Sequence, residues 1–494
     1  MEHPLLVDEL PPSQGSRSAD AGQSEPVAHP SGSAAPALPP LPNLPPSDVL
    51  LLRPSDPQYA NYLAAANIRA QLRPALRAVC KTEHAVAVMV DWVRTNNLSF
   101  AVRCGGHSYE GFSQSSNVVI DLRGLNSIKL DTTSRRVTVG AGVSLYQIYQ
   151  AVAAHGLALA AGSCPTVGVS GHVLGGGHGL LARSQGLTCD NLELATIVDS
   201  EAQTLQASAT SNPDLYWACR GGGGGSFGIA TQFALNVFPL ANALVFGVSW
   251  KLSQAHAAQI FATWQGWAPA APNTITSILK IGPAGNGMII LRCIGQSIGT
   301  ESELRNALKT IVGLQAPSSP LTIQSLSFLN AVKHFAGPLD YESVYMKAKS
   351  DYVFTPLGPA AIQTMLAAVA DVPVGGIALL CDAYGGRISD VAAADTAFAR
   401  RGGTQYCMQY YSSWTRATDT TAHLAQVARV YAAMRPFMTG ASYINYCDLD
   451  LQDWANAYWG ANLDRLSAVK RAYDPANVFQ HAQSVPVGPA IVSA

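Results

Sequence analysis

The sequence has little net charge and a small share of charged residues. Of its 494 residues, 31 are Lys or Arg and 32 are Asp or Glu, so the formal net charge is −1. Such a balance produces no broad field that would concentrate nucleic acid or anionic lipid on the surface. We therefore expect no nucleic-acid partner and a small, weakly charged substrate.

Long hydrophobic runs are missing as well. No apolar stretch reaches the roughly 18 residues that a membrane-spanning helix needs, and candidates such as 151–162 are interrupted by a polar residue, here His155. The first residues include Glu2, Asp8 and Glu9 and lack the basic segment and apolar core of a secretory signal. These absences predict a protein with no membrane partner and a cytoplasmic location, and they leave the oligomeric state open.

Closely spaced cysteines are also absent. The nine cysteines lie far apart, without the short spacings of a zinc site or a disulfide framework. His172 and His178 lie among glycines, with no carboxylate or thiolate at metal-ligand spacing. We expect no bound metal.

The residues that are present describe a well-buried globular protein with many tight turns, since 48% are hydrophobic and 43 are glycine. Residues 1–46 differ, because Pro, Ser, Ala and Gly dominate there without an amphipathic period, and we expect a disordered tail. Residues 47–240 alternate strand-like and helix-like segments and predict an α+β domain. Its expected elements are helices at 85–95 and 144–154, the latter capped by Ser144, and strands at 99–103, 118–122, 193–198 and 204–207.

A second domain, built on a sheet, is expected at 241–443. Its expected elements are strands at 245–250 and 288–292 and Ala-rich helices at 360–370 and 392–400. The last part, 444–494, contains a helix from Leu463 that ends at Asp474-Pro475, because proline cannot continue the helical hydrogen-bond ladder.

Two glycine-rich segments carry the chemistry. Arg103-Cys104-Gly105-Gly106-His107-Ser108-Tyr109 follows a predicted strand, and its glycines allow backbone N–H groups to approach a phosphate. Taken alone, this segment is equally well a Gly-rich turn with an incidental histidine. Segment 162–179 has seven glycines in eighteen residues, which indicates backbone lying against a large planar or phosphorylated ligand.

With these motifs the sequence resembles the berberine-bridge-enzyme-like oxidases, within the vanillyl-alcohol oxidase and p-cresol methylhydroxylase superfamily, over about 47–484. In that family the His of R-x-G-G-H-S-Y bonds the 8α-methyl carbon of the flavin, and the Cys of G-x-C-x-x-V-G bonds flavin C6. His107 and Cys164 occupy these positions. The resemblance therefore implies FAD covalently bound through both residues, as in bicovalent oligosaccharide oxidases. Segments 186–191, 220–229 and 473–479 resemble later parts of the family's flavin domain.

The resemblance also implies the fold and the cofactor contacts. It implies an α+β chain in which a two-part FAD-binding domain, 47–240 and 444–494, is closed by both chain ends and carries an inserted substrate domain, 241–443, with an antiparallel sheet backed by helices. Besides the two attachment residues, the expected FAD-binding residues are Arg103, Cys104, Gly105, Gly106, Ser108, Gly162, Thr166, Val167, Gly168, Gly171, His172, Gly175, Gly176, Gly179, Leu180, Asn191, Gly228, Ile229, Tyr446 and Asn477.

A nicotinamide-binding Rossmann fold is the competing interpretation, because 223–228 formally matches G-x-G-x-x-G. In a Rossmann fold these glycines follow a strand and open a helix. Here they follow a helix-like segment, 214–219, and lead into a strand-like one, 229–237. We reject the Rossmann interpretation.

Oxidation of an alcohol by a flavin requires a base for the hydroxyl proton. Segment 442–448 has strand-like alternation, so we expect only one of Tyr443 and Tyr446 to face the flavin. The resemblance to oligosaccharide oxidases selects Tyr446 as the base and Asp382 as its partner. The alternatives are a core tyrosine at 446 and a turn aspartate at 382, ahead of Gly385-Gly386.

An ionised Asp382 would raise the pKa of a neighbouring phenol above its usual value of about 10. We therefore expect Tyr446 to take the substrate proton while passing its own to Asp382. The resemblance also places Tyr109 and Gln409 at the substrate groove. Leu380 and Cys381, just before Asp382, are apolar where hydrogen bonds to sugar hydroxyls are expected.

These features predict an FAD-dependent oxidase that acts on a CH–OH group of a sugar, oligosaccharide or similar alcohol and reduces O2 to H2O2. The apolar pair before Asp382 favours, as an alternative, a tailoring oxidase for a glycosylated natural product or alkaloid. A flavin-binding protein with little turnover is a third hypothesis, against which the presence of both Tyr446 and Asp382 argues.

Overall fold

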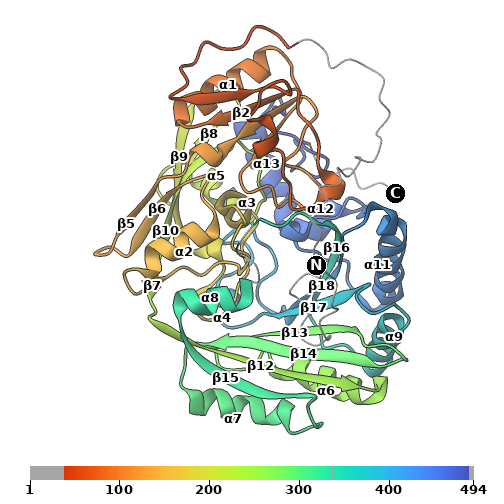
Figure 1. The fold of residues 1–494 in the computed structure, drawn as a ribbon. Coiled ribbons are helices and arrows are strands. Elements are labelled where there is room, and N and C mark those ends of the chain that lie inside the picture. The colour runs from red at the N-terminus through yellow and green to blue at the C-terminus, as the bar shows by residue number, and fades with distance from the viewer. Residues whose placement is uncertain (1–37, 337–338, 340, 489–494) are drawn as a thin grey trace.

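The computed structural model describes residues 38–336, 339 and 341–488. Most of the expected tail, residues 1–37, lies outside this part of the chain. Figure 1 shows two α/β bodies, an upper one formed by both ends of the chain and a lower one formed by its middle. None of the described helices is long and apolar enough to cross a membrane.

The upper body contains two main sheets. The first is four-stranded, with β1 (Val49–Leu52), β2 (Leu76–Cys80), β4 (Val118–Asp121) and β3 (Phe100–Arg103) side by side in this order. The second is an antiparallel five-stranded sheet in the order β5 (Ile128–Asp131), β6 (Arg136–Gly140), β10 (Ile229–Asn236), β8 (Leu192–Val198) and β9 (Thr204–Ser208). Two short strands, β7 (Leu157–Ala158) and β11 (Phe238–Pro239), pair separately.

Helices cover these sheets and share one hydrophobic core with them. They are α1 (Glu83–Thr95), α2 (Leu145–Ala153), α3 (Val169–Leu174), α4 (Ala182–Gln185), α5 (Pro213–Ala218), α12 (Trp454–Trp459) and α13 (Leu463–Tyr473). Leu463, Leu466 and Val469 of α13 pack into the same core as Val86 and Met89 of α1. The C-terminal segment thus completes the body that the N-terminal half begins (Figure 1).

The lower body is built on one seven-stranded sheet in which every neighbouring pair is antiparallel. In spatial order its strands are β15 (Ser319–Ser327), β12 (Asn242–Leu252), β14 (Ile289–Ser297), β13 (Ile275–Pro283), β17 (Ala378–Ala383), β18 (Tyr406–Trp414) and β16 (Tyr345–Val353). The helices of this body are α6 (Gln254–Trp267), α7 (Glu301–Val312), α8 (Phe328–Ala336), α9 (Pro359–Ala370), α10 (Arg387–Asp390) and α11 (Thr420–Met434).

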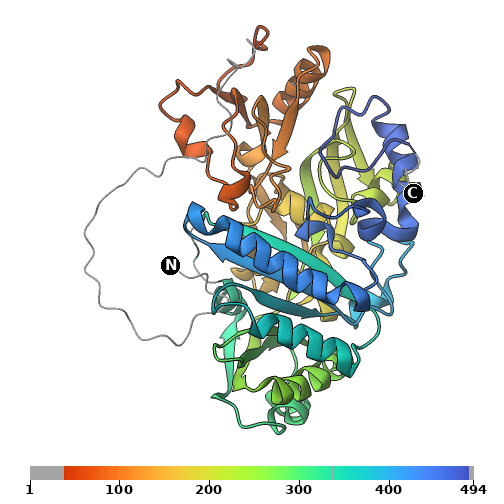
Figure 2. The same cartoon turned by 90° about the vertical axis from the view of Figure 1, so that its right-hand side faces the viewer.

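Helices α6, α9 and α11 pack on one face of the seven-stranded sheet around a second hydrophobic core. Figure 2 shows α11 (blue) and α9 (teal) lying across the sheet. The opposite face is left for side chains that line a cavity between the two bodies, among them Lys280, Leu380 and Asp382. This arrangement agrees with the expected α+β fold, in which an antiparallel sheet backed by helices accompanies a two-part domain.

Short 3-10 helices connect several of these elements. They span Tyr59–Tyr62, Ile68–Ala70, Leu122–Gly124, Thr188–Asn191, Ala417–Asp419, Arg435–Phe437, Ile444–Tyr446 and Gly460–Asn462. The seventh of them, η7 (Ile444–Tyr446), lies where the sequence suggested a strand at 442–448. That strand prediction is wrong, and it affects the interpretation of the two tyrosines described below.

A predicted helix at 392–400 is also wrong, because this segment forms turns and loops. Its backbone groups bond to other parts of the chain instead of to a helical ladder. Trp217 donates its indole N–H to the Ala394 carbonyl at 2.8 Å, and the Asn462 side chain donates to the Ala393 carbonyl at 2.8 Å. Tertiary hydrogen bonds and burial of Phe398 outweigh the helix propensity of the alanines.

The end of the expected tail is packed against the upper body. Leu38, Leu41 and Leu44 contact its hydrophobic core, and Trp92 donates a hydrogen bond to the Pro40 carbonyl at 2.9 Å. The sequence placed these residues in the tail because prolines break any amphipathic period. Extended Pro-rich chain nevertheless has leucines to bury when a core offers a groove for them.

Candidate active site

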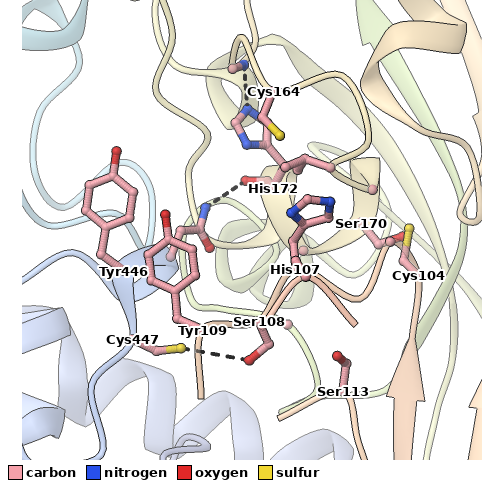
Figure 3. Close-up of a pocket in the computed structure, with 18 of the residues that line it drawn as sticks. Cys104, His107, Ser108, Tyr109, Ser113, Cys164, Ser170, His172, Tyr446 and Cys447 are labelled. Carbon is pink, nitrogen blue, oxygen red and sulfur yellow. Dashed lines mark hydrogen bonds between the residues drawn. The ribbon is translucent and has the colours of Figure 1, made fainter. Parts of the chain in front are cut away.

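A cavity of about 510 Å³ separates the glycine-rich loops of the upper body from the open face of the seven-stranded sheet. Both glycine-rich segments singled out in the sequence contribute to its walls, as do strands β13, β17 and β18. Figure 3 shows His107 and Cys164 projecting into this space, with the rings of Tyr109 and Tyr446 beside them.

His107 and Cys164 are joined through one hydroxyl group. The His107 Nε2 atom lies 2.9 Å from Thr166 Oγ1, and the Cys164 Sγ atom lies 3.9 Å from the same oxygen. Burial, assisted by the Arg103 charge, lowers the pKa of His107 to about 4, so its imidazole is neutral near pH 7. Cys164 is accessible from the cavity, and its partial withdrawal from solvent raises the pKa of its thiol. Two nucleophilic side chains 57 positions apart in sequence therefore face one ligand space.

The loops that carry these residues touch through glycines. A Cβ atom on Gly105 would lie 2.4 Å from the backbone N of Gly168, and one on Gly168 would lie 2.1 Å from Cys104 Sγ. No side chain fits at this crossing. These two glycines are explained by contact between the loops.

Other glycines face the cavity itself. A Cβ atom on Gly171 would meet nothing within 4 Å, and one on Gly224 would come no closer than 3.7 Å to a neighbour, Leu174 Cδ1. Both residues line the cavity. Packing within the protein does not require glycine at these positions, whereas a ligand lying against the backbone does.

Gly171→Ala tests this explanation, because it separates folding from ligand binding. Gly171 lies inside helix α3, where alanine is favoured over glycine by up to about 1 kcal/mol. We expect unchanged or higher thermal stability but a reduced flavin content after purification, measured by absorbance per chain. Gly266→Ala in α6, which also meets nothing within 4 Å, is the control and should keep its flavin. Equal flavin content in the two variants would contradict a ligand seated on Gly171.

Asp382 and Tyr446 meet on the sheet side of the cavity. Asp382 is the fifth residue of strand β17, and Tyr446 ends the 3-10 helix η7. The Tyr446 hydroxyl donates a hydrogen bond to Asp382 Oδ2 at 3.2 Å. Asp382 therefore belongs to a strand, and the turn aspartate considered from the sequence is excluded. Its buried carboxylate and the phenol are both lining groups of the cavity.

Burial controls the protonation of this pair. It raises the pKa of Asp382, an effect that His178, the Tyr446 hydrogen bond and Lys280 partly offset. The pKa of Tyr446 is raised well above its usual range, first by burial and then by the Asp382 charge. The phenol is consequently neutral at rest, and the carboxyl group of Asp382 can accept its proton only when it is ionised, above its raised pKa.

Both tyrosines of the 442–448 segment line the cavity, so the expectation that only one of them faces it is wrong. The 3-10 geometry of η7 brings residues three apart to the same side. The Tyr443 and Tyr446 rings lie edge to face with centroids 4.9 Å apart. Their hydroxyl groups differ in partner, because that of Tyr443 accepts hydrogen bonds from the Gly177 and His178 backbone at 3.0 and 3.3 Å.

Tyr109 and Gln409 also meet at the cavity. Gln409 Nε2 donates to the Tyr109 hydroxyl at 3.1 Å, and the Tyr109 ring stacks on that of Tyr446 with a centroid distance of 5.8 Å. Strand alternation directs Leu380 and Asp382 of β17 to the cavity, and it buries Cys381 in the core behind the sheet. Cys381 thus does not face a substrate, contrary to the interpretation of the sequence, whereas Leu380 does.

A buried ion-pair network holds the segments that carry Tyr109 and Tyr446. Lys347 donates to Glu110 at 2.6 Å and to Asp448 at 2.6 Å, and Lys349 donates to Asp448 at 2.8 Å. Glu110 adjoins Tyr109, and Asp448 follows Tyr446 by two residues. Strand β16 therefore fixes both tyrosines relative to the sheet.

Most of the residues predicted to bind FAD line the cavity, but five do not: Arg103, Gly175, Gly176, Asn191 and Asn477. Arg103 is buried behind the first loop and donates to the Ala64 carbonyl. Asn191 donates to the carbonyls of Gln185 and Leu187. A Cβ atom on Gly175 would lie 1.9 Å from Asn445 Oδ1, and one on Gly176 would lie 2.7 Å from Phe398 Cδ2. Asn477 occupies a turn, with φ at +52°.

The histidines of the second segment hold its backbone. His172 Nε2 accepts a hydrogen bond from the Gly162 N–H at 2.9 Å, and burial lowers the pKa of His172 to about 4. His178 stacks on Tyr384 with centroids 4.9 Å apart. Within the described residues no group of three or more metal-ligating side chains lies together.

Several lining residues were not identified in the sequence. They include Leu145, Gly223, Gly224, Gly225, Ser226, Lys280, Phe479, His481 and Gln483. The glycine run at 221–225 was a detectable signal, because it resembles a later segment of the flavin domain. Lys280 had a weaker one, since it is the single charged residue of the strand Ile275–Pro283.

Comparisons with known proteins agree with this geometry. A family model described as "FAD binding domain" matches residues 74–208, and one described as "Berberine and berberine like" matches residues 442–486. The chain belongs to the berberine-bridge-enzyme-like family of FAD-linked oxidoreductases. It is 32% identical to the uncharacterised FAD-linked oxidoreductase YgaK of Bacillus subtilis, over 87% of this chain and 95% of that relative.

Further family members show the same extent of similarity. Reticuline oxidase of Eschscholzia californica is 30% identical over 80% of each chain. The solved structure of Physcomitrella patens BBE-like 1 superposes with a TM-score of 0.84 at 29% identity and covers 90% of this chain and 98% of the other. Membership of this family identifies FAD as the cofactor. The glycine-lined cavity between the two bodies is the site where it would bind.

Proposed function

We propose that this family member is an FAD-dependent oxidase that acts on a hydroxyl-bearing carbon of a sugar, oligosaccharide or similar alcohol and produces H2O2 from O2. The hydrogen bond of 3.2 Å between Tyr446 and Asp382, inside the cavity that His107 and Cys164 also line, is the observation that supports it. A base and a proton acceptor that both line one pocket are the groups that alcohol oxidation requires of the protein.

His107 and Cys164 would hold the cofactor covalently in this proposal. Both are nucleophiles on loops fixed against each other at Gly105 and Gly168, and the low pKa of His107 keeps its ring unprotonated and able to form a bond. When bound, FAD supplies two-electron chemistry, which the protein cannot provide by itself.

The proton of the substrate hydroxyl passes to Tyr446. Because the pKa of Tyr446 is raised, a resting tyrosinate is excluded, and the phenol must release its own proton to Asp382 as it receives that of the substrate. Asp382 ends the step protonated. The hydroxyl carbon loses its hydrogen as a hydride, for which bound FAD would be the two-electron acceptor, and becomes a carbonyl or a lactone carbon. Tyr109 and Gln409, joined at 3.1 Å, would position the hydroxyl-bearing part of the substrate.

This scheme predicts an acid limb in the pH profile of flavin reduction. Asp382 accepts a proton only as the carboxylate, so the rate is full above its pKa and falls about tenfold per pH unit below it. Because burial raises this pKa, the limb should lie above the usual aspartate pKa of about 3.9. We expect Asp382→Asn to be slower and to lack the limb, as measured by anaerobic stopped-flow mixing across pH. If Asp382→Asn showed the same acid limb as the wild type, the limb would belong to another titrating group.

A second candidate function is a tailoring oxidase for a glycosylated natural product or alkaloid. It is favoured by the apolar cluster that lies beside Tyr109, formed by Met346, Leu380 and Tyr411. Reticuline oxidase is a relative at 30% identity whose name records a substrate other than a sugar.

A substrate panel with a peroxide readout separates the two candidates. It should contain mono- and oligosaccharides, simple benzylic alcohols and benzylisoquinoline alkaloids, each tested with the purified FAD-loaded protein. The leading proposal predicts peroxide with at least one carbohydrate. Peroxide only with the aromatic compounds would replace it by the second candidate.

A further inference from the structure

Lys280 is a buried lysine that forms no ion pair with any of the described residues. Its side chain lines the cavity and the residue is only 9% exposed. Within the described part of the chain, its ammonium group makes no hydrogen bond or ion pair. The other buried lysines are paired: Lys347 and Lys349 with Asp448, and Lys470 with Asp474.

The position of Lys280 in the sheet places it beside the Tyr446–Asp382 pair. In the register of β13 with β17, Ile278 lies opposite Asp382 and Lys280 lies opposite Leu380. Lys280 and Asp382 are therefore diagonal neighbours on one face, with a typical backbone separation of about 7–8 Å. Their charged groups form no ion pair among the described residues, and this backbone spacing is comparable with the length of one sugar ring and its substituents.

Two charged residues act on Lys280, the cation Arg292 and the anion Asp382. Arg292 of β14 is its direct cross-strand neighbour. Burial, followed by the Arg292 charge, lowers the pKa of Lys280 to about 8, and Asp382 only partly offsets this effect. The other carboxylate at the cavity wall, Glu342, interacts with Cys164 and Tyr411 and does not affect Lys280. Near pH 7 most Lys280 side chains still carry their charge.

A charge that is partly withdrawn from water costs free energy unless an opposite charge lies near it, and a ligand anion in the cavity would supply that charge to Lys280. We propose that Lys280 binds a carboxylate of the substrate, which makes the substrate an acidic sugar or a related hydroxy acid. The carboxylate lies about one ring away from the hydroxyl that Tyr446 deprotonates, and it is not itself changed in the reaction. This inference rests on the proposed function, and it narrows the class of alcohol.

A carboxylate fits better than a phosphate monoester. Lys280 offers a single compact ammonium group, which matches one negative charge. A phosphate monoester carries nearly two charges near pH 7. Its second charge would face the carboxyl group of Asp382.

Matched pairs of sugars test the proposal directly. We expect the wild-type enzyme to show a kcat/KM at least 10-fold higher for D-glucuronate and D-galacturonate than for D-glucose and D-galactose. Lys280→Met should abolish this preference, mainly through KM for the uronates, and Lys280→Arg should retain part of it. Lys251→Met, which replaces an exposed lysine on strand β12 of the same sheet, is the control and should leave the preference unchanged.

Outcomes that contradict the proposal are distinct from a failure of the proposed function. The assignment of Lys280 would be overturned if neutral sugars were oxidised as well as uronates. It would also be overturned if Lys280→Met lowered kcat/KM equally for uronates and for neutral sugars. A preference for glucose 6-phosphate over glucuronate would overturn the choice of carboxylate. If no sugar reduces the flavin, the proposed function fails.

Two readouts do not depend on turnover. Calorimetric titration of FAD-loaded Tyr446→Phe with D-glucuronate should show binding that weakens at least 10-fold when Lys280→Met is added, and the absence of any binding would contradict the proposal. The thermal midpoint of Lys280→Met should equal or exceed that of the wild type, because a buried unpaired charge is removed. A large fall in the midpoint would identify Lys280 as a structural residue instead.

Discussion

The double variant His107→Ala/Cys164→Ala should lose all its flavin when it is denatured, whereas the denatured wild-type chain should remain yellow. The physical reason is that two nucleophiles with a shared contact to Thr166 face one cavity, and under the proposed double attachment each would provide an independent bond to the flavin. Each single variant should therefore keep its flavin through the remaining residue. Denaturation, removal of small molecules and measurement of flavin absorbance with the chain would show this.

Cys104→Ala is a matched control for the loss of a thiol at the same cavity. The Cys104 Sγ atom points to the Ala141 carbonyl at 2.9 Å, behind the loop, and its removal should leave flavin attachment intact. Release of flavin from the denatured wild-type protein would refute covalent attachment. Release from only one single variant would show that one residue alone forms the bond.

Tyr446→Phe should slow reduction of the flavin by substrate about 10²–10⁴-fold, the range typical of a missing general base. The ring and its stacking on Tyr109 are kept, but the proton path to Asp382 is broken. The rate constant of reduction, measured anaerobically under single-turnover conditions, is the relevant quantity.

Tyr443→Phe is the matched control for this substitution. The Tyr443 hydroxyl accepts hydrogen bonds from the backbone N–H groups of Gly177 and His178, so its loss should cost about 1–3 kcal/mol of stability. Its effect on the reduction rate should remain within about tenfold. A Tyr446→Phe variant that reduces its flavin at the wild-type rate would show that Tyr446 is not the base.

Local signals in the sequence were sufficient for much of the fold. Ser144 was expected to cap a helix, and it does so through a reciprocal capping box with Gln147. The helix from Leu463 ends at Tyr473, just before Asp474-Pro475. The Rossmann fold was rejected because the glycine run follows a helix-like segment and precedes a strand-like one. The structure has helix α5 before these glycines and strand β10 after them. These features depend on caps, prolines and periodicity, which short windows of sequence contain.

Features that depend on tertiary contacts were predicted less well. The alanines at 392–400 favour a helix, but Trp217 and Asn462 take their carbonyls as acceptors. The alternation at 442–448 favours a strand, but the hydrogen bonds that Tyr443 accepts belong to a loop far away in the sequence. Neither partner is visible from the segment itself.

In the candidate site, too, features with a recognisable sequence motif were predicted and features that depend on tertiary contacts were not. The pairing of Tyr446 with Asp382 was expected from two motifs 64 positions apart, and the structure brings the two side chains together at 3.2 Å. Lys280 was not expected, because a single lysine in an apolar strand does not reveal which sheet face it occupies or whether an anion lies near it. Only the register with β17 places it beside Asp382.

Anaerobic mixing of the FAD-loaded wild-type protein with hydroxylated compounds tests the central claim most directly. The panel should include neutral sugars, uronates, oligosaccharides and benzylic alcohols, with dithionite to establish that the flavin can be reduced. The account predicts that at least one of the alcohols bleaches the flavin, and that air restores the colour with one H2O2 formed per flavin. A flavin that dithionite bleaches but that none of these alcohols reduces would contradict the account.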